Sequence, residues 1–371
     1  MSNPFQLLDE GKVHTCDPKS DYRVAYGSRV ARLDSGELVC SFMSGSALAM
    51  NSVAPFLSRS KDNGKTWSPA TLVWPHLTET MSLFPNISRA PDGRLFLYGI
   101  SIPIEPGKKG QTYWSDATQG ISQTDIIWAV SGDGGKSWTE SKKMPRLLPG
   151  SHEAPGALCV TRKNVWVAPY SPYNTWDPNE KVERGHVVAM RSENEGKTWT
   201  ASSMIKFAEP HSGGAEAWVI ELTDGRLLGT TWHIDHKANG SHTNKYALSS
   251  DGGKTWSKAN TTTTNGNTTV LEPYSDGRAL FGWVKRKKEE SGIGVAVVKP
   301  TEADFGIQSQ QMVYVAKKAT QSGKDNTANE FQDFSFGEPS LTVLPNKELL
   351  MTFWAIEGNW SGIHWKKYRM G

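Results

Sequence analysis

Apolar residues in this chain are grouped in short runs, and pairs of runs recur along its length. An apolar run, a short polar turn that is often Asp-Gly, and a second apolar run follow one another six times. The six units span residues 26–42, 84–100, 154–170, 216–232, 268–284 and 338–354. Short apolar runs separated by Asp, Asn and Gly predict β-hairpins. We therefore expect six hairpins and no long helix.

A second pattern, Ser-x-Asp-x-Gly-x-(Ser/Thr)-Trp, follows each of the first four hairpins. Its copies span residues 60–67, 131–138, 192–199 and 249–256, and the third has Asn194 in the Asp position. The Asp or Asn side chain can accept hydrogen bonds from turn N–H groups, and the Gly allows a positive φ. The Trp can cover the hydrophobic seam below the turn. This Asp-box pattern predicts a second hairpin turn in each repeat.

Two hairpins in each of six repeats predict a particular all-β architecture. Six four-stranded antiparallel units arranged radially make a six-bladed β-propeller, which leaves only short strand edges. The last repeat lacks a strand, since residues 362–369 supply only its third. We expect residues 5–14 to complete that blade, which would tie down both chain ends. No linker interrupts the pattern, so residues 1–371 are predicted to be a single domain.

The blade pattern also predicts which face of the propeller carries the site. Both kinds of turn lie on one face, and the loops that join second to third strands lie on the other. Those loops are long and aromatic, as in 43–53 and 102–124, the latter with Tyr113 and Trp114. Aromatic side chains with a few convergent polar groups suit a sugar, whose C–H faces stack on rings while its hydroxyls need partners. The predicted partner is therefore a glycan or glycoside.

Further side chains at this face are candidates for binding the substrate. They come from the starts of the inner strands and from the loops that join second to third strands. The candidates are Arg29, Asn86, His152, Tyr170, His211, Trp232, His233 and Trp354.

The Asp boxes on a six-fold, four-stranded repeat resemble the sialidase (neuraminidase) superfamily, and the likeness covers essentially the whole chain. Residues 216–228, E-A-W-V-I-E-L-T-D-G-R-L-L, are similar to the family strand E-P-S-V-V-E-L-x-D-G-R-L-L. In that strand the first Glu polarises a tyrosine nucleophile. The resemblance therefore implies that Glu216 takes this place in a sialidase-like propeller.

The chain departs from the sialidase pattern at several functional positions. Trp232 stands where the resemblance implies an arginine of the carboxylate-binding triad. Residues 25–28 replace the F/Y-R-I-P motif, with Arg29 three residues late, and Glu338 lies near the expected tyrosine nucleophile. Loop 43–53, where an acid/base Asp is expected, has no carboxylate. Because Trp cannot replace the bidentate grip of an arginine on a carboxylate, we expect a glycosidase other than a true sialidase.

Glutamates remain as candidates for the chemistry. Glu153, Glu216 and Glu338 lie at or beside the first residue of an inner strand in the third, fourth and sixth units. Two carboxylates that flank a glycosidic bond are sufficient for its hydrolysis. The resemblance extends to other propellers of this fold, including exo-arabinanases, that use glutamates. We predict an exo-acting glycoside hydrolase with Glu216 as one partner and Glu338 or Glu153 as the other.

Two alternatives to hydrolysis stay open. A lyase acting on a uronate-containing glycan would need a His or Tyr base and a cation for the carboxylate, and His152, His211, Tyr170 and Arg29 could supply them. A non-catalytic glycan-binding propeller would use the same loops without chemistry, and the glutamates would then only accept backbone N–H groups.

No cofactor is expected, although one pair of histidines needs weighing. His233 and His236 could hold a divalent metal, but their spacing is not diagnostic, and neutral, hydrogen-bonded histidines are the expected state. The site prediction therefore includes no metal ligand.

Charge and hydropathy exclude other classes of partner. The chain has 41 basic and 38 acidic residues, and the basic ones are scattered, which does not favour nucleic acid. The one basic cluster, within 285–290, is predicted to be a solvated hairpin loop. No apolar run approaches the ~18 residues of a membrane span.

Cysteine usage and the N-terminus bear on the compartment. Cys16, Cys40 and Cys159 cannot all be paired and lack metal-site spacing, so we expect reduced thiols. The first residues lack the order of a signal peptide. The prediction is a cytoplasmic protein, or a secreted one from which a signal peptide was removed.

Overall fold

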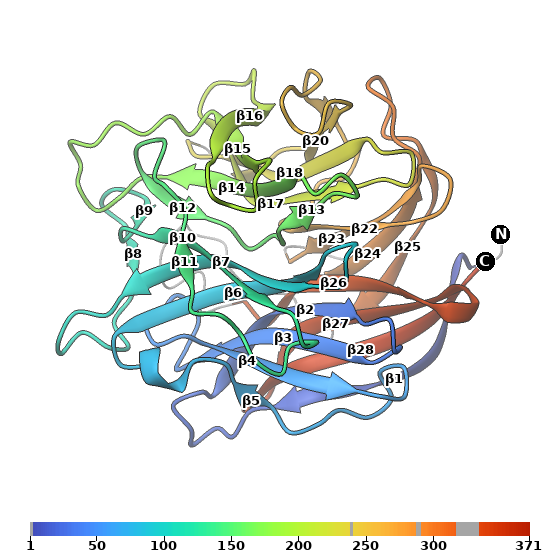
Figure 1. Cartoon of the computed structure of the whole chain (residues 1–371), viewed down its shortest axis with the longest axis horizontal. Coiled ribbons are helices and arrows are strands. Elements are labelled where there is room, and N and C mark those ends of the chain that lie inside the picture. Colours follow the sequence, from blue (N-terminus) through green and yellow to red (C-terminus); the bar gives the residue numbers. More distant parts are fainter. Residues whose placement is uncertain (1–2, 238–239, 287–290, 317–333) are drawn as a thin grey trace.

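The computed structural model describes residues 3–237, 240–286, 291–316 and 334–371. These residues form a ring of six antiparallel blades in chain order (Figure 1), which confirms the predicted six-bladed β-propeller. Two 3₁₀ turns, η1 (Pro75–Leu77) and η2 (Pro345–Lys347), are the helical elements of the described part.

Each of the first three blades runs from the inner strand outward. The first contains β2 (Val24–Arg32), β3 (Leu38–Gly45), β4 (Ala54–Ser60) and β5 (Thr71–Leu72). The second contains β6 (Met81–Arg89), β7 (Leu95–Pro103), β10 (Asp125–Ser131) and β11 (Lys142–Lys143). The third has a divided inner strand, β12 (Ser151–Glu153) and β13 (Cys159–Val160), followed by β14 (Trp166–Tyr173), β15 (His186–Ser192) and β16 (Thr200–Lys206).

The remaining blades keep the same order. The fourth contains β17 (Ser212–Glu221), β18 (Leu227–Asp235), β20 (Lys245–Ser249) and β21 (Asn260–Thr261), with the short β19 (Gly240–Ser241) beside β18. The fifth contains β22 (Thr269–Pro273), β23 (Ala279–Lys285), β24 (Gly292–Val298) and β25 (Ile307–Val315). The sixth contains β26 (Phe336–Leu344), β27 (Glu348–Glu357), β28 (Trp360–Met370) and β1 (Phe5–Thr15). A small ribbon of β8 (Trp114–Ser115) and β9 (Gly120–Ile121) lies in the β7–β10 loop.

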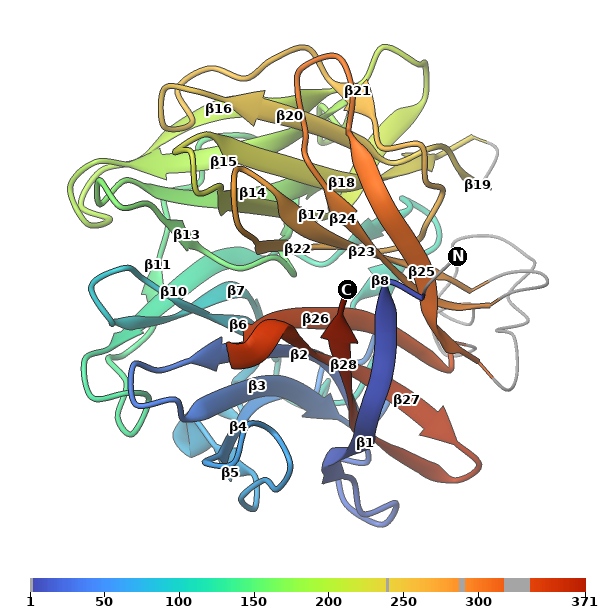
Figure 2. The same ribbon diagram turned by 90° about the vertical axis from the view of Figure 1, so that its right-hand side faces the viewer.

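The two ends of the chain meet in one sheet, as predicted. β1 pairs antiparallel with β28 from Phe5 opposite Met370 to Thr15 opposite Gly362. Figure 2 shows β1 alongside β28 at the edge of the sixth blade. The ring is therefore closed by backbone hydrogen bonds between segments at opposite ends of the sequence.

The Asp boxes form the predicted turns. In the first box Ser60 Oγ accepts from the Gly64 N–H at 2.9 Å and donates to Asp62 at 2.8 Å. Asp62 in turn accepts from both the backbone and the hydroxyl of Thr66. The same Ser-to-Gly bond recurs at 2.8–2.9 Å in the other three boxes. Each box thus closes its turn with its own side chains, and arginines of the preceding blade, Arg59 and Arg191, donate to the Gly134 and Gly252 carbonyls of two boxes.

Aromatic side chains fill the core between blades. Trp166 packs edge-to-face against Phe96 and Trp128, with ring centroids 4.8 and 5.0 Å apart. Trp199, from the third Asp box, joins this cluster, as the pattern predicted. The three cysteines are free thiols, and Cys16 and Cys40 are buried. Within the part of the chain that the structure describes, no helix has the length and apolar character needed to span a membrane.

Candidate active site

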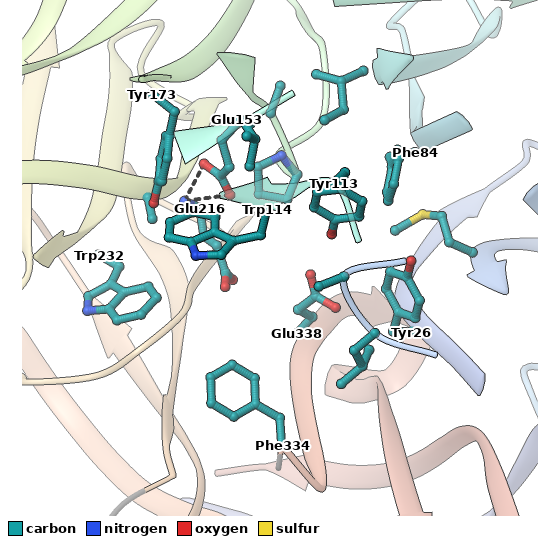
Figure 3. Close-up of a pocket in the computed structure, with 18 of the residues that line it drawn as sticks. Tyr26, Phe84, Tyr113, Trp114, Glu153, Tyr173, Glu216, Trp232, Phe334 and Glu338 are labelled. Atoms are coloured by element: carbon teal, nitrogen blue, oxygen red, sulfur yellow. Dashed lines mark hydrogen bonds between the residues drawn. The ribbon is translucent and has the colours of Figure 1, made fainter. Parts of the chain in front are cut away.

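A cavity of about 200 Å³ lies where all six blades converge (Figure 3). It opens on the predicted face, since the β3–β4 and β7–β10 loops contribute to its wall. Its lining is Tyr26, Met43, Leu48, Ala49, Phe84, Ile100, Tyr113, Trp114, Ile121, Glu153, Ala154, Pro155, Tyr173, Ala215, Glu216, Trp232, Arg286, Phe334, Glu338 and Trp354. Three carboxylates thus face a largely aromatic and aliphatic enclosure.

Two of the glutamates occupy equivalent bulges in their inner strands. The pairing of β17 with β18 shifts between Ala215 and Trp218, and that of β26 with β27 shifts between Gly337 and Ser340. Glu216 and Glu338 lie inside these shifts with φ of 51° and 44°. A bulge re-aims a side chain locally. Both bulges turn a glutamate into the cavity (Figure 3).

The side chain of Glu153 is hydrogen-bonded to the backbone of Glu216. Its carboxylate oxygens accept from the Glu216 N–H at 2.9 and 3.2 Å. That N–H belongs to the bulge and has no place in the β17–β18 ladder. Glu153 therefore fixes the position of Glu216 across the gap between the third and fourth blades.

Burial raises the pKa of two of the three carboxyl groups. Burial, reinforced by the Glu338 carboxylate, raises the pKa of Glu216 to about 7, and the nearby Arg286 opposes that shift. Burial and the charge of Glu216 also raise the pKa of Glu153 well above its usual range. Glu216 Oε2 is buried and accepts no hydrogen bond from the described residues. A group that carries its proton near neutrality and has a free oxygen can act as a general acid.

Arg286 is part of the cavity, and its position corrects a prediction. It is 2% exposed, its Nε donates to the Phe336 carbonyl at 3.2 Å, and its guanidinium lies 4.2 Å from the centroid of the Phe334 ring. The prediction of a solvated loop was therefore wrong for Arg286, because cation–π contact and burial replace water. Residues 287–290 of that cluster lie outside the described residues.

Two tyrosines stand on the Glu338 side of the cavity (Figure 3). Burial, with the proximity of Tyr113 and Glu338, raises the pKa of Tyr26 well above its usual range. Burial likewise raises the pKa of Tyr113, so both phenols keep their protons. The Tyr26 hydroxyl is buried without a hydrogen-bond partner among the described residues. It is thus available to a ligand in the cavity.

The structure brings some predicted site residues together and leaves others apart. Glu153, Glu216, Glu338, Trp232 and Trp354 line the cavity. Six further predicted residues do not line it, namely Arg29, Asn86, His152, Tyr170, His211 and His233.

Arg29 lies beneath the cavity rather than in its wall. Its Nη1 donates to the carbonyls of Ser28 and Glu338 at 2.7 and 3.2 Å, and its Nη2 donates to that of Pro155 at 3.2 Å. The guanidinium also stacks over the Trp218 ring at 4.8 Å. Asn86, which is fully buried, donates to the same Pro155 carbonyl at 2.6 Å. These groups support the floor of the site.

The predicted histidines lie outside the cavity, and two of them are held by neighbouring residues. Burial lowers the pKa of His152 and of His233 to about 4, so both are neutral at pH 7. His152 bonds Thr124 and packs against Tyr170, while His233 bonds Ser212 Oγ at 2.8 Å. His211 is exposed. Among the described residues, no group of three or more His, Cys, Asp or Glu side chains is placed to hold a metal ion.

Sequence reasoning did not single out Tyr26, Phe84, Phe334 or Arg286 as site residues. Arg286 directly follows the second strand of the fifth blade, and Trp232 and Trp354 lie near the ends of the second strands of the fourth and sixth blades. This shared position could have identified Arg286 as a candidate site residue from the sequence. Phe334 precedes β26 and carried no signal, because nothing in the local pattern places it over the cavity.

Comparisons with known proteins agree with this architecture. A family model described as BNR/Asp-box repeat matches residues 247–258, which include the whole fourth box. A search of curated proteins finds no match.

Solved structures show the same fold at low sequence identity. A Dyadobacter fermentans protein of unknown function is 18% identical with a TM-score of 0.75, covering 99% of this chain and 100% of that one. The NanB sialidase of Streptococcus pneumoniae is 15% identical with a TM-score of 0.67. The match covers 100% of this chain and 71% of the NanB chain. The α-L-arabinofuranosidase Arb93A of Fusarium graminearum is 16% identical with a TM-score of 0.63, covering 98% of each chain. The chain is therefore an Asp-box, six-bladed propeller with the fold of the sialidases and of this arabinofuranosidase.

Proposed function

We propose that this protein is an exo-acting glycoside hydrolase that cleaves a neutral glycoside with Glu216 and Glu338. The single observation that carries the proposal is the pair of equivalent bulges in β17 and β26. They turn two glutamates into one enclosed cavity. Strained backbone that directs ionisable groups into a cavity is a common feature of active sites.

The two glutamates take different roles in the proposed reaction. Glu216, with a pKa of about 7, donates its proton to the glycosidic oxygen as the bond to the anomeric carbon breaks. The Glu338 carboxylate acts on the opposite side of the sugar, either as the nucleophile or as the base that takes a proton from water. The water oxygen ends on the anomeric carbon and the leaving group departs as an alcohol. Glu153 positions Glu216 through the backbone bond and does not itself react.

The lining favours a neutral sugar over a sialic acid. Arg286 is the one cationic side chain among the described lining residues. Trp232 occupies the place where the sialidase resemblance implies a second cation. Aromatic rings instead surround the cavity, which suits the C–H faces of an uncharged sugar.

The lyase alternative has less support from the geometry. His152 and Tyr170, two of its predicted residues, are buried outside the cavity. A base for proton abstraction would have to be a lining tyrosine such as Tyr26. A non-catalytic binding site would have no need of two bulges that direct carboxyl groups into one cavity.

The proposal is tested by substituting the two glutamates. Purified wild type, Glu216→Gln and Glu338→Gln are assayed on a panel of neutral aryl glycosides and on sialyl and uronyl substrates. We expect hydrolysis of a neutral glycoside by wild type and a loss of kcat/KM of about 100-fold or more in each variant. Glu272→Gln is the matched control, because Glu272 is a glutamate of β22 outside the cavity whose Oε1 accepts from the Val343 N–H.

Three results would contradict the proposal. Equal activity of wild type and Glu216→Gln would remove Glu216 from the chemistry. An unsaturated product from a uronate substrate would establish the lyase reading. Binding of glycans without any product would leave a lectin-like propeller.

A further inference from the structure

A second hollow of about 410 Å³ opens beside the cavity and shares Tyr113 with it. Three loops form its walls: the β3–β4 loop with Asn51, the β7–β10 loop, and the β14–β15 loop with Trp176. The lining is Asn51, Pro103, Glu105, Lys108, Gln111, Thr112, Tyr113, Ser122, Gln123, Thr175, Trp176, Asp177 and Glu180. We call this hollow the outer groove. Its shared wall makes it the continuation of the cavity over the second and third blades.

Trp176 presents an aromatic surface in this groove. The side chain is 47% exposed, which is unusual for a tryptophan in a molecule whose other indoles mostly pack in the core. Its Nε1 donates to the Tyr113 carbonyl at 3.1 Å. Because that bond anchors the ring edge, the indole face remains open to a ligand. An anchored, exposed indole is a stacking surface for the apolar face of a sugar.

Two buried polar atoms in the groove wall lack partners among the described residues. Asn51 is 9% exposed, and its Nδ2 donates to the Pro103 carbonyl at 3.1 Å while its Oδ1 accepts nothing. The Ser122 hydroxyl is likewise buried and unpaired. Buried polar groups are nearly always hydrogen-bonded, so these atoms call for a donor or acceptor from outside the protein.

The charged groups of the groove are already engaged. Glu180 accepts from the Gly150 N–H and from the Thr175 hydroxyl, at 2.9 and 2.6 Å. Lys108 pairs with Glu105 at 2.5 Å. Asp177 accepts from the Asn179 N–H at 2.9 Å, so a charged ligand would compete with existing partners of these groups. A neutral ligand with several hydroxyl groups would not.

The groove is held in shape before any ligand arrives. The Asn51 N–H donates to the Gln111 carbonyl at 2.7 Å, and the Gly110 N–H donates to the Asn51 carbonyl at 2.9 Å. The Tyr113 N–H bonds the Ala49 carbonyl in the same way. These bonds join the loops of the first two blades, so little ordering remains to oppose binding.

From these observations we propose that the outer groove binds the sugars that follow the terminal one in a neutral oligosaccharide. The terminal sugar then occupies the cavity, the chain passes Tyr113, and the next sugars stack on Trp176. Asn51 and Ser122 bond their hydroxyls. This inference rests on the proposed function for its orientation, since the terminal sugar is placed at Glu216 and Glu338.

The test measures binding without turnover. Calorimetric titrations use Glu216→Gln protein and neutral arabino-, xylo-, cello- and manno-oligosaccharides of one to four units. Adding Trp176→Ala should weaken the best tri- or tetrasaccharide about tenfold and leave the monosaccharide affinity unchanged. Ser122→Ala should weaken the longer ligands by a smaller factor. Trp360→Ala is the matched control, because Trp360 is 53% exposed and lies on the sixth blade.

The outcomes separate this proposal from the hydrolase proposal. Binding that depends on Trp176, in a protein whose wild type hydrolyses nothing, supports the groove and contradicts the hydrolase. Hydrolysis of aryl glycosides, with oligosaccharide affinity equal in Trp176→Ala and Trp360→Ala, supports the hydrolase and overturns the groove. Absence of oligosaccharide binding across the panel also overturns the groove.

Discussion

Glu216 and Glu338 have a left-handed backbone that is uncommon for residues other than glycine. The inner strand of the first blade has the same bulge, between Tyr26 and Arg29, and there the left-handed residue is Gly27. A Cβ on Gly27 would come within 2.0 Å of Met43 Cε. The same bulge thus carries a carboxylate in the fourth and sixth blades and none in the first. In the two glutamates the left-handed backbone goes with a side chain that lines the cavity, and the surrounding strands must offset its strain.

Arg286 should control the pH at which Glu216 acts. Its positive charge lowers the pKa of Glu216, so removing the charge in Arg286→Gln should raise that pKa above about 7. A general acid with a higher pKa stays protonated to a higher pH, and the alkaline limb of kcat/KM should move upward. Arg286→Lys keeps the charge and should move the limb less. A limb that stays in place or moves downward in Arg286→Gln would show that Glu216 is not the acid.

The Asp box acts at the scale of a single hairpin. Its hydroxyl, carboxylate and turn N–H groups bond one another within eight residues, so the turn geometry is set locally. Arginines of the preceding blade add a bond to the Gly134 and Gly252 carbonyls of two boxes. The third box works with Asn194, whose Oδ1 accepts from the Thr198 N–H at 2.9 Å. The box lies on the face opposite the cavity and supports the scaffold without touching the site.

Ser60→Ala should therefore change stability without changing catalysis. Losing the hydroxyl leaves the buried Gly64 N–H without its 2.9 Å partner, at a cost of about 1–3 kcal/mol in the free energy of unfolding. Urea titration of the variant measures this loss, and kcat on the best substrate should equal that of wild type. Ser35→Ala, in the exposed β2–β3 turn, is the control. A large loss of activity in Ser60→Ala at full folding would place the box in the functional machinery.

At the scale of the whole molecule, the pairing of β1 with β28 decides whether the ring is closed. Phe5 is 1% exposed and belongs to the same core cluster as Tyr368 and Met370. Leu8, in the same strand, is 36% exposed. The closure is thus a packed seam as well as a hydrogen-bonded ladder.

Phe5→Ala should weaken the packing between β1 and β28 and lower the stability of the closed ring. Truncating a fully buried Phe costs about 3–5 kcal/mol, whereas Leu8→Ala on the outer face should stay within about 0.5 kcal/mol of wild type. Thermal unfolding followed by circular dichroism compares the two variants, and exchange of the β28 amide hydrogens should increase only in Phe5→Ala. Equal unfolding temperatures would show that the terminal strand contributes little to closure.

Much of the fold could be predicted from the sequence, because its signals are local. Hairpin turns and strand runs depend on neighbouring residues, so the six repeats, the four Asp boxes and the face of the site followed from the pattern. The closing strand also followed, since one blade was a strand short. Glu153, Glu216 and Glu338 could be named as candidates because the repeat placed each at the start of an inner strand.

The division of roles within the site needed the tertiary structure. Arg29 and Trp232 were both predicted to contact the substrate, yet Arg29 lies beneath the cavity and Trp232 lines its wall. The backbone bond from Glu216 to Glu153, and the burial of Arg286 against Phe334, join residues more than forty positions apart. Sequence by itself determined the architecture, since hairpins and turns are set by residues close in the chain. Only the folded ring decided which side chains meet at its axis, because that depends on bulges and on contacts between blades.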